Sequence, residues 1–304
     1  MSMRLPFVLL VVSLWTGPTD AQSHKAWIWD KRDAKEIAKL EKAVTEESGR
    51  FHLESESWII DTEVDARFTA ELALFMDRFR TAFDGLLEGL HDGSQVEGKP
   101  RIYIWDTKEE YERAEPGGSR GYFRYTYDAQ HKMRLTLYSF VDGAEERQFK
   151  FFYYPILIHE GAHCLLKSYV GEARLPMWFD EGVATYFQFW DLRASGRQNL
   201  KSRHQRSFFR DLMKETYLEA PPSLAELRGV HVWNPDNMGP IANRHYAFAE
   251  SFTDLLLSSK EGRKVFKTMF QRILTNEPPL PDDELATLET AWHAHIRSRL
   301  GLKK

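Results

Sequence analysis

Three residues in the middle of the chain, His159, Glu160 and His163, form the pattern His-Glu-x-x-His. Residues four apart lie on the same face of a helix, so the two histidines can offer imidazole nitrogens to one metal ion. Glu160 lies beside them, where its carboxylate can accept a proton from a water that the metal activates. Apolar residues at 151–158 and 164–166 predict that this helix is buried. Because burying unpaired polar groups is costly, the pattern predicts a metal site.

A second carboxylate in an apolar setting follows at Glu181, within the stretch 175–187. Pro176 suits the first turn of a helix, where a missing N–H leaves no hydrogen bond unmade. Glu181 then falls early in this helix, at a position where an apolar residue is expected. A catalytic zinc site takes three protein ligands and a water, and His, His and Glu are one of the known ligand sets. Asp180 is the alternative third ligand.

The two helical motifs lie close together in the sequence. They read His159-Glu160-x-x-His163 and Trp178-x-x-Glu181-Gly182-x-Ala184-x-Tyr186. Together they resemble the gluzincin clan of zinc metallopeptidases, most of all secreted bacterial branches in which the second motif supplies the third ligand. Carried over by position, the resemblance implies that His159, His163 and Glu181 bind Zn²⁺ and that Glu160 is the general base.

The resemblance implies an exported zinc-dependent metallopeptidase, in which zinc-bound water attacks a peptide carbonyl and Glu160 accepts its proton. Tyr246, on a helix predicted at 243–259, looks like the clan's oxyanion-stabilising residue. The sequence lacks the Gly-x-Met-Glu-Asn stretch with which the clan's aminopeptidases bind a free amine. This favours an endopeptidase acting on a peptide or protein. One alternative is a zinc-containing module that binds peptides or proteins with little or no turnover, and another is a structural protein without metal.

The elements that position these residues can be predicted from hydrophobic periodicity. It predicts a strand at 51–55, a long helix at about 61–90, a strand at 101–105 and a hairpin of strands at 121–127 and 132–140. The resemblance implies a zincin-like α+β fold, with a small mixed or antiparallel sheet, the active-site helix and a mainly helical C-terminal lobe. By the same resemblance, strand 132–140 is the edge strand that holds an extended substrate.

The predicted domain organisation begins with a secretory signal peptide at 1–21, which has a positive Arg4, an apolar run at 5–15 and small residues before a cut after Ala21. This run is too short to span a bilayer comfortably, and no later run approaches that length. We therefore expect an exported protein, periplasmic or secreted, without a membrane span after cleavage. Residues 22–49 are predicted to form a helical extension. A peptidase domain follows at 50–304, with a sheet and metal-helix lobe at 50–170 and a helical lobe at 171–304.

Composition narrows the function classes further. The 304 residues are 42% hydrophobic, which is enough for a sizeable core, and the net charge of −4 argues against a nucleic-acid binder. Cys164 is the single cysteine, so the chain has no internal disulfide framework, and we expect this thiol to fill buried apolar space. The sequence leaves the oligomeric state open.

Overall fold

The computed structural model describes residues 29–88, 96–114, 119–143, 153–188, 190–191, 200–201, 210, 213–215, 217–229 and 240–302. The predicted signal peptide lies outside these residues. Within them, no helix combines the length and the apolar character that crossing a membrane would require.

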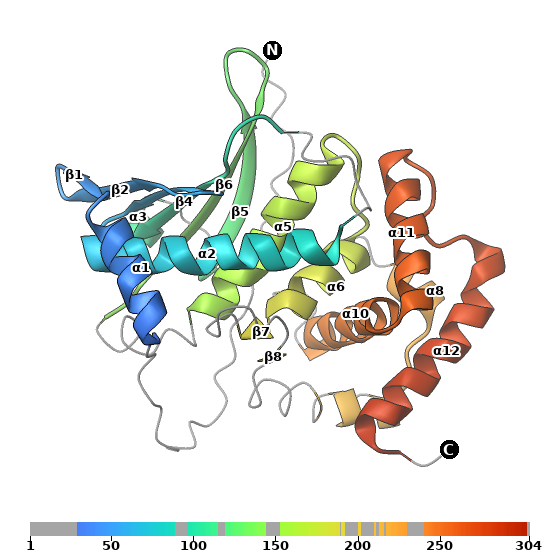
Figure 1. Cartoon of the computed structure of the whole chain (residues 1–304). Helices are drawn as coiled ribbons and strands as arrows, with labels where there is room; N and C mark the ends of the chain where they lie inside the picture. The colour runs from blue at the N-terminus through green and yellow to red at the C-terminus, as the bar shows by residue number, and fades with distance from the viewer. Residues whose placement is uncertain are drawn as a thin grey trace.

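Six strands form one mixed sheet in the order β1-β2-β3-β4-β6-β5 (Figure 1). Their bounds are β1 Thr45–Glu47, β2 Arg50–Glu54, β3 Ile59–Thr62, β4 Arg101–Trp105, β5 Gly121–Tyr127 and β6 Met133–Phe140. The pairs β3–β4 and β4–β6 are parallel, whereas β1–β2, β2–β3 and β5–β6 are antiparallel. The predicted α+β fold with a mixed sheet is therefore confirmed.

The edge of this sheet nearest the metal-helix region is β5. The prediction that strand 132–140 is the edge strand is wrong, because β6 lies between β4 and β5. The inner strand of the hairpin pairs in parallel with β4, for example Tyr138 with Tyr103, and this leaves the other strand outermost. Periodicity finds both strands of a hairpin, but it does not say which strand returns into the sheet.

Two long helices cover one face of the sheet, α2 (Ala66–Leu86) over β2 and β3, and α5 (Tyr154–Val170) over β5 and β6. Asp65 caps α2 by accepting a hydrogen bond of 2.6 Å from the backbone N–H of Phe68. The helix predicted from about 61 therefore begins later, because residues 59–62 form β3. The inward-facing side chains Ile60, Ile102 and Leu137 are fully buried, and each stabilises the fold by about 1.5–3 kcal/mol.

The other face of the sheet carries aromatic residues and the short helix α3 (Lys108–Ala114). Thr107 caps this helix, accepting a hydrogen bond of 3.2 Å from the backbone N–H of Glu110. Tyr111 of α3 packs its ring against Trp105 and Phe140 of the sheet.

At the N-terminal end of the described chain, α1 (Lys31–Glu41) packs on α2. Asp30 caps α1 by accepting hydrogen bonds of 2.8 Å from the backbone N–H groups of Arg32 and Asp33. Ile37 is buried against α2, and the buried Asp33 forms an ion pair with Arg78 of α2. Within the segment predicted as a helical extension, α1 is thus followed by β1, which joins the sheet.

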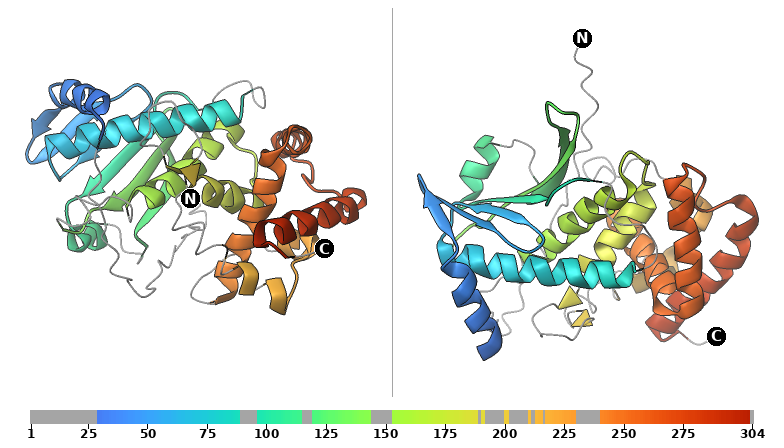
Figure 2. Two further views of the ribbon diagram at one scale, coloured as in Figure 1. Left: turned by 60° about the horizontal axis from the view of Figure 1, so that its bottom comes forward. Right: turned by 45° about the horizontal axis from the view of Figure 1, so that its top comes forward.

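The chain beyond the sheet is mainly helical, as predicted. Its elements are α6 Met177–Gln188, β7 Trp190–Asp191, β8 Leu200–Lys201, α8 Leu224–Gly229, α10 Pro240–Ser258, α11 Lys260–Leu274 and α12 Asp282–Leu300. Helices α10, α11 and α12 gather on the side of α6 away from the sheet (Figures 1 and 2). The helix predicted at 243–259 is confirmed as α10.

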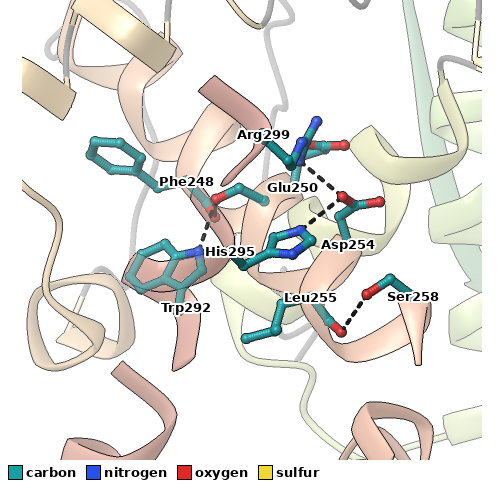
Figure 3. A network of polar contacts seen from close by, with 9 residues as sticks. Phe248, Glu250, Asp254, Leu255, Ser258, Trp292, His295 and Arg299 are labelled. Carbon is teal, nitrogen blue, oxygen red and sulfur yellow. Dashed lines mark hydrogen bonds and ion pairs between the residues drawn. The ribbon is translucent and has the colours of Figure 1, made fainter. Parts of the chain in front are cut away.

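A network of charged side chains joins α10 to α12 (Figure 3). Arg299 lies 2.9 Å from Glu250 and 3.2 Å from Asp254, and His295 lies 3.0 Å from Asp254. Since Glu250 is only 1% exposed, this pairing is what allows its carboxylate to lie inside the helical region. The network fixes α10, which carries Tyr246.

Candidate metal centre

The helix α5 brings His159, Glu160 and His163 into the interior of the protein. Pro155 occupies its first turn, and Gly171 ends it with a φ of 56°, a left-handed value that glycine adopts without strain. His159 is 2% exposed, Glu160 1% and His163 4%, so α5 is the buried helix that the apolar flanks predict.

A second buried helix, α6, brings Glu181 to the same place. Gly182 lets α6 pack closely on α10, because a Cβ there would lie 2.8 Å from the backbone oxygen of Ala249 on α10. Glu181 is fully buried, and its Oε2 lies 3.3 Å from Nε2 of His159 and 3.6 Å from Nε2 of His163. The two Nε2 atoms are 3.2 Å apart. Three donor atoms therefore converge on one point, all within 4.8 Å of one another.

The outward nitrogens of both imidazole rings face acceptors on α6. Nδ1 of His163 lies 2.7 Å from Oδ1 of Asp180, and Nδ1 of His159 lies 3.2 Å from Oε1 of Gln188. An acceptor at Nδ1 keeps the proton of a neutral ring there and leaves the Nε2 lone pair available. Both rings are thus held with their Nε2 atoms ready to bind a cation.

The carboxylates of Asp180 and Glu181 favour a positive charge at the two histidines. Burial alone would lower the pKa of His163, but Asp180 and Glu181 outweigh it and raise that pKa to about 10. At His159, burial and the neighbouring His163 lower the pKa to about 4. Burial also raises the pKa of Glu181. The carboxylates therefore stabilise one positive charge on the pair His159 and His163, whereas a second positive charge on this pair is unfavourable.

The donor set fits a metal ion such as Zn²⁺. Among the described residues, neither carboxylate oxygen of Glu181 has a hydrogen-bond partner, although the side chain is fully buried. A buried carboxylate without a partner is strongly destabilising, and a metal ion would satisfy it. Two imidazole nitrogens and one carboxylate oxygen are also ligands that Zn²⁺ prefers. The geometry is that of a group that could bind a metal.

Glu160 lies at the boundary between α5 and the edge strand β5. The backbone N–H of Phe123 faces its carboxylate and lowers its pKa slightly, while Oε1 has no hydrogen-bond partner among the residues that the structure describes. Burial raises the pKa of Glu160 to about 7. A carboxylate with this pKa can take up and release a proton near neutral pH.

The ring of Tyr246 on α10 lies next to the ring of His159, with the two centroids 6.2 Å apart. Burial, followed by the nearby charges of Glu181, Glu160 and Asp180, raises the pKa of its hydroxyl far above the usual value. The hydroxyl thus remains protonated and can act as a hydrogen-bond donor.

The structure brings together every residue that the sequence singled out for the site, and it adds two. Asp180, the alternative third ligand, faces Nδ1 of His163 instead of the point where the three donors converge. Gln188 and Phe123 were not predicted. Gln188 could have been found by its spacing, since it lies seven residues after Glu181 on the same helical face. The role of the Phe123 backbone depends on tertiary packing and leaves no signal in the sequence.

A comparison of the chain with protein-family models finds no match, and a search among curated proteins finds no significant match. The case for a function rests on the geometry of the site.

Proposed function

We propose that this protein is a zinc-dependent metallopeptidase that hydrolyses peptide bonds and acts as an endopeptidase. The observation that carries the proposal is the convergence of three buried donor atoms beside Glu160, a buried carboxylate with an oxygen left unpaired among the described residues. A pure binding site would have no use for a base at this place. A structural site would be closed by a fourth protein ligand, and the described residues within reach provide three.

The metal ligands in this proposal are Nε2 of His159, Nε2 of His163 and the carboxylate of Glu181. When bound, Zn²⁺ supplies a Lewis acid that acidifies water and polarises a carbonyl oxygen. Asp180 and Gln188 hold the two rings in the orientation that binding requires, through their contacts with the Nδ1 atoms.

Glu160 acts as the general base and then as the general acid. It accepts the proton of the attacking water and passes this proton to the leaving amine. Burial raises its pKa to about 7, and the positive charge of a bound cation would lower that pKa again. The backbone N–H of Phe123 faces its carboxylate. Tyr246 donates a hydrogen bond to the oxyanion that forms on the scissile carbonyl. Loss of one such donor typically costs about 3 kcal/mol of transition-state stabilisation.

The substrate in this proposal is a peptide or protein segment in extended conformation. It pairs with the edge strand β5, whose Phe123 contacts the general base. Backbone pairing suits cleavage within a chain because it does not require a free terminus. The protein acts after export, in the periplasm or outside the cell, as the sequence at 1–21 suggests.

Metal analysis combined with an activity assay tests the proposal. Mass spectrometry of protein purified without a metal-binding tag should find about one zinc ion per chain, lost in Glu181→Ala and kept in Asp180→Ala. Glu160→Gln should keep zinc and lose cleavage of a denatured protein substrate. Zinc-loaded wild type that cuts no peptide would contradict the peptidase and favour a zinc-containing binding module. Cleavage by Glu160→Gln at the wild-type rate would contradict the assigned base.

A further inference from the structure

Along the edge strand β5, residues whose backbone groups bond to β6 alternate with residues whose backbone groups point away from the sheet. The N–H of Asp128 donates to the carbonyl of Lys132 at 3.0 Å, which defines a hydrogen-bonded pair at the end of the hairpin. Such pairs alternate along an antiparallel ladder, so the even-numbered residues of β5 bond to β6. Phe123, Tyr125 and Tyr127 direct their N–H and C=O groups to the opposite edge. The N–H of Phe123 faces the carboxylate of Glu160 and not β6, which agrees with this assignment.

The same odd-numbered residues turn their side chains toward α5. A Cβ at Gly121 would lie 3.0 Å from the side chain of Ile156 on α5, which identifies the helix side of the strand. Side chains alternate between the two faces of a strand, so Phe123, Tyr125 and Tyr127 share this side with Gly121. The backbone groups that a substrate would pair with therefore belong to residues whose side chains lie along the metal helix.

Two of these side chains are exposed aromatic rings. Tyr125 is 41% exposed and Tyr127 is 43% exposed, and among the residues that the structure describes only Leu218 is a further large apolar side chain of this kind. An exposed aromatic pair beside a catalytic group indicates a contact surface for a ligand.

The ring of Tyr125 is held in place by its neighbours. The amine of Lys167 lies over it, 4.6 Å from the ring centroid, and the ring of Tyr127 meets it edge-on at 6.3 Å. Tyr127 in turn donates a hydrogen bond to Glu172. Lys167 follows His163 by four residues, so it continues the helical face that carries the two histidines. Tyr125 thus lies beside Lys167, whose position on α5 follows that of His163 by one helical turn.

We propose that Tyr125 determines substrate specificity, selecting extended peptides that carry an aromatic or β-branched side chain at the position opposite Tyr125. This inference rests on the proposed function and names its substrate class. The selected position lies beyond Phe123 on the side of Lys167, because the N–H of Phe123 faces the carboxylate of Glu160 and does not pair with the substrate. Residues directly opposite each other in a ladder have side chains on the same face. Aromatic–aromatic and aromatic–β-branched pairs are among the favourable combinations there.

Peptide selection separates this inference from the peptidase proposal. The Glu160→Gln protein, loaded with zinc, is used to capture members of a random decapeptide library, and wild type is used to digest the same library. Both should enrich Phe, Tyr, Val or Ile at one fixed position. Tyr125→Ala, made in both backgrounds, should remove this enrichment and lower kcat/KM for enriched peptides about threefold to fivefold.

Two further variants serve as controls. Tyr125→Phe keeps the ring and should keep the enrichment. Thr126→Ala changes the next residue of the strand, whose backbone bonds to β6 and whose side chain lies on the other face, and it should also keep the enrichment. A structural role of Tyr125 would not change one substrate position alone.

The possible failures have different meanings. Cleavage without a preferred position, or a preference that Tyr125→Ala leaves intact, would overturn the role of Tyr125 while the peptidase proposal stands. Capture with the predicted preference but no cleavage by wild type would overturn the peptidase and support Tyr125 in a binding module. Neither capture nor cleavage would overturn both.

Discussion

Oδ1 of Asp180 lies 2.7 Å from Nδ1 of His163, on the side of the ring away from the point where the three donor atoms converge. The next residue, Glu181, directs Oε2 to the opposite ring nitrogen, Nε2, at 3.6 Å. Successive residues of a helix point about 100° apart, so two adjacent carboxylates on α6 can reach both nitrogens of one ring. The two residues are thus candidates for different tasks, one orienting the imidazole and the other binding the metal.

Replacing Asp180 by Asn should lower the affinity for zinc about 10-fold to 100-fold without abolishing binding. The amide can still accept the Nδ1–H of His163, but it no longer carries the charge that supports the ring. Glu181→Gln should weaken zinc binding far more, because it removes a ligand. Competition with a chromogenic chelator measures both affinities. Equal affinity of Asp180→Asn and wild type would contradict the orienting role, and a greater loss in Asp180→Asn than in Glu181→Gln would make Asp180 the ligand.

Two glycines in buried helices should respond differently to Ala. A Cβ at Gly182 would lie 2.8 Å from the backbone oxygen of Ala249, whereas one at Gly161 would meet the side chains of Phe79 at 2.9 Å and Met76 at 3.2 Å. Side chains can move aside and a helix backbone cannot. We expect Gly182→Ala to lower the free energy of unfolding by about 2 kcal/mol, despite the helix propensity of Ala. Gly161→Ala should lower it by less, about 1 kcal/mol, because the Met76 methyl can move and only the buried Phe79 ring must shift, as urea denaturation would show.

The fold could be predicted from the sequence wherever one face of an element is buried. The stripe of apolar residues in α2 and the alternation in β6 follow from such burial, and both elements were found. The predicted start of α2 is too early because Asp61 and Thr62, which end the short strand β3, are also residue types that suit the start of a helix. The identity of the edge strand depends on the pairing of β4 with β6, which are far apart in the sequence. A local sequence pattern does not predict such a pairing.

Asp77 should make stability depend on pH. Burial raises its pKa above the usual 3.8, although the hydroxyl of Ser55 and the N–H of Ser57 each donate a hydrogen bond of 2.9 Å to its carboxylate. The folded state therefore holds this proton more tightly than the unfolded state. The stabilising contribution is fully present below pH 3.8 and is lost as the pH rises through the raised pKa.

The variant Asp77→Asn cannot titrate at this position and should gain stability relative to wild type as the pH rises from about 4 to about 7, by about 1.4 kcal/mol for each unit of the pKa difference. Urea denaturation at several pH values measures the free energies of unfolding of the two proteins. A difference between them that stays constant with pH would show that Asp77 titrates alike in the folded and unfolded states.

The candidate site could be predicted as far as its residues follow helical spacing. His159 and His163 are one turn apart on α5, so helical spacing predicts that they lie together. Glu181 lies on α6, and the expectation that it joins them comes from the resemblance of the two motifs to the gluzincin clan. The residues that face the Nδ1 atoms of the two histidines are harder to predict from the sequence. Asp180 was noticed only as a rival ligand, because the direction of its side chain depends on how α6 crosses α5. The prediction that the Cys164 thiol fills buried apolar space is confirmed, because this side chain is fully buried in α5.

Two Arg–Glu ion pairs of similar length should differ in their effect on stability because they differ in burial. Arg299 lies 2.9 Å from Glu250, whose side chain is 2% exposed, whereas Arg113 lies 2.8 Å from Glu109 with both side chains largely exposed. Removing one partner of a buried pair leaves a charge in a poorly solvated place, and Arg299 also contacts Asp254. We expect Arg299→Ala to lower the free energy of unfolding by about 3 kcal/mol, and Arg113→Ala to change it by less than about 0.5 kcal/mol.

Since α10 carries Tyr246, Arg299→Ala should also reduce the rate of peptide cleavage more than the zinc content. Equal unfolding free energies of the two variants would contradict a structural role for the network between α10 and α12.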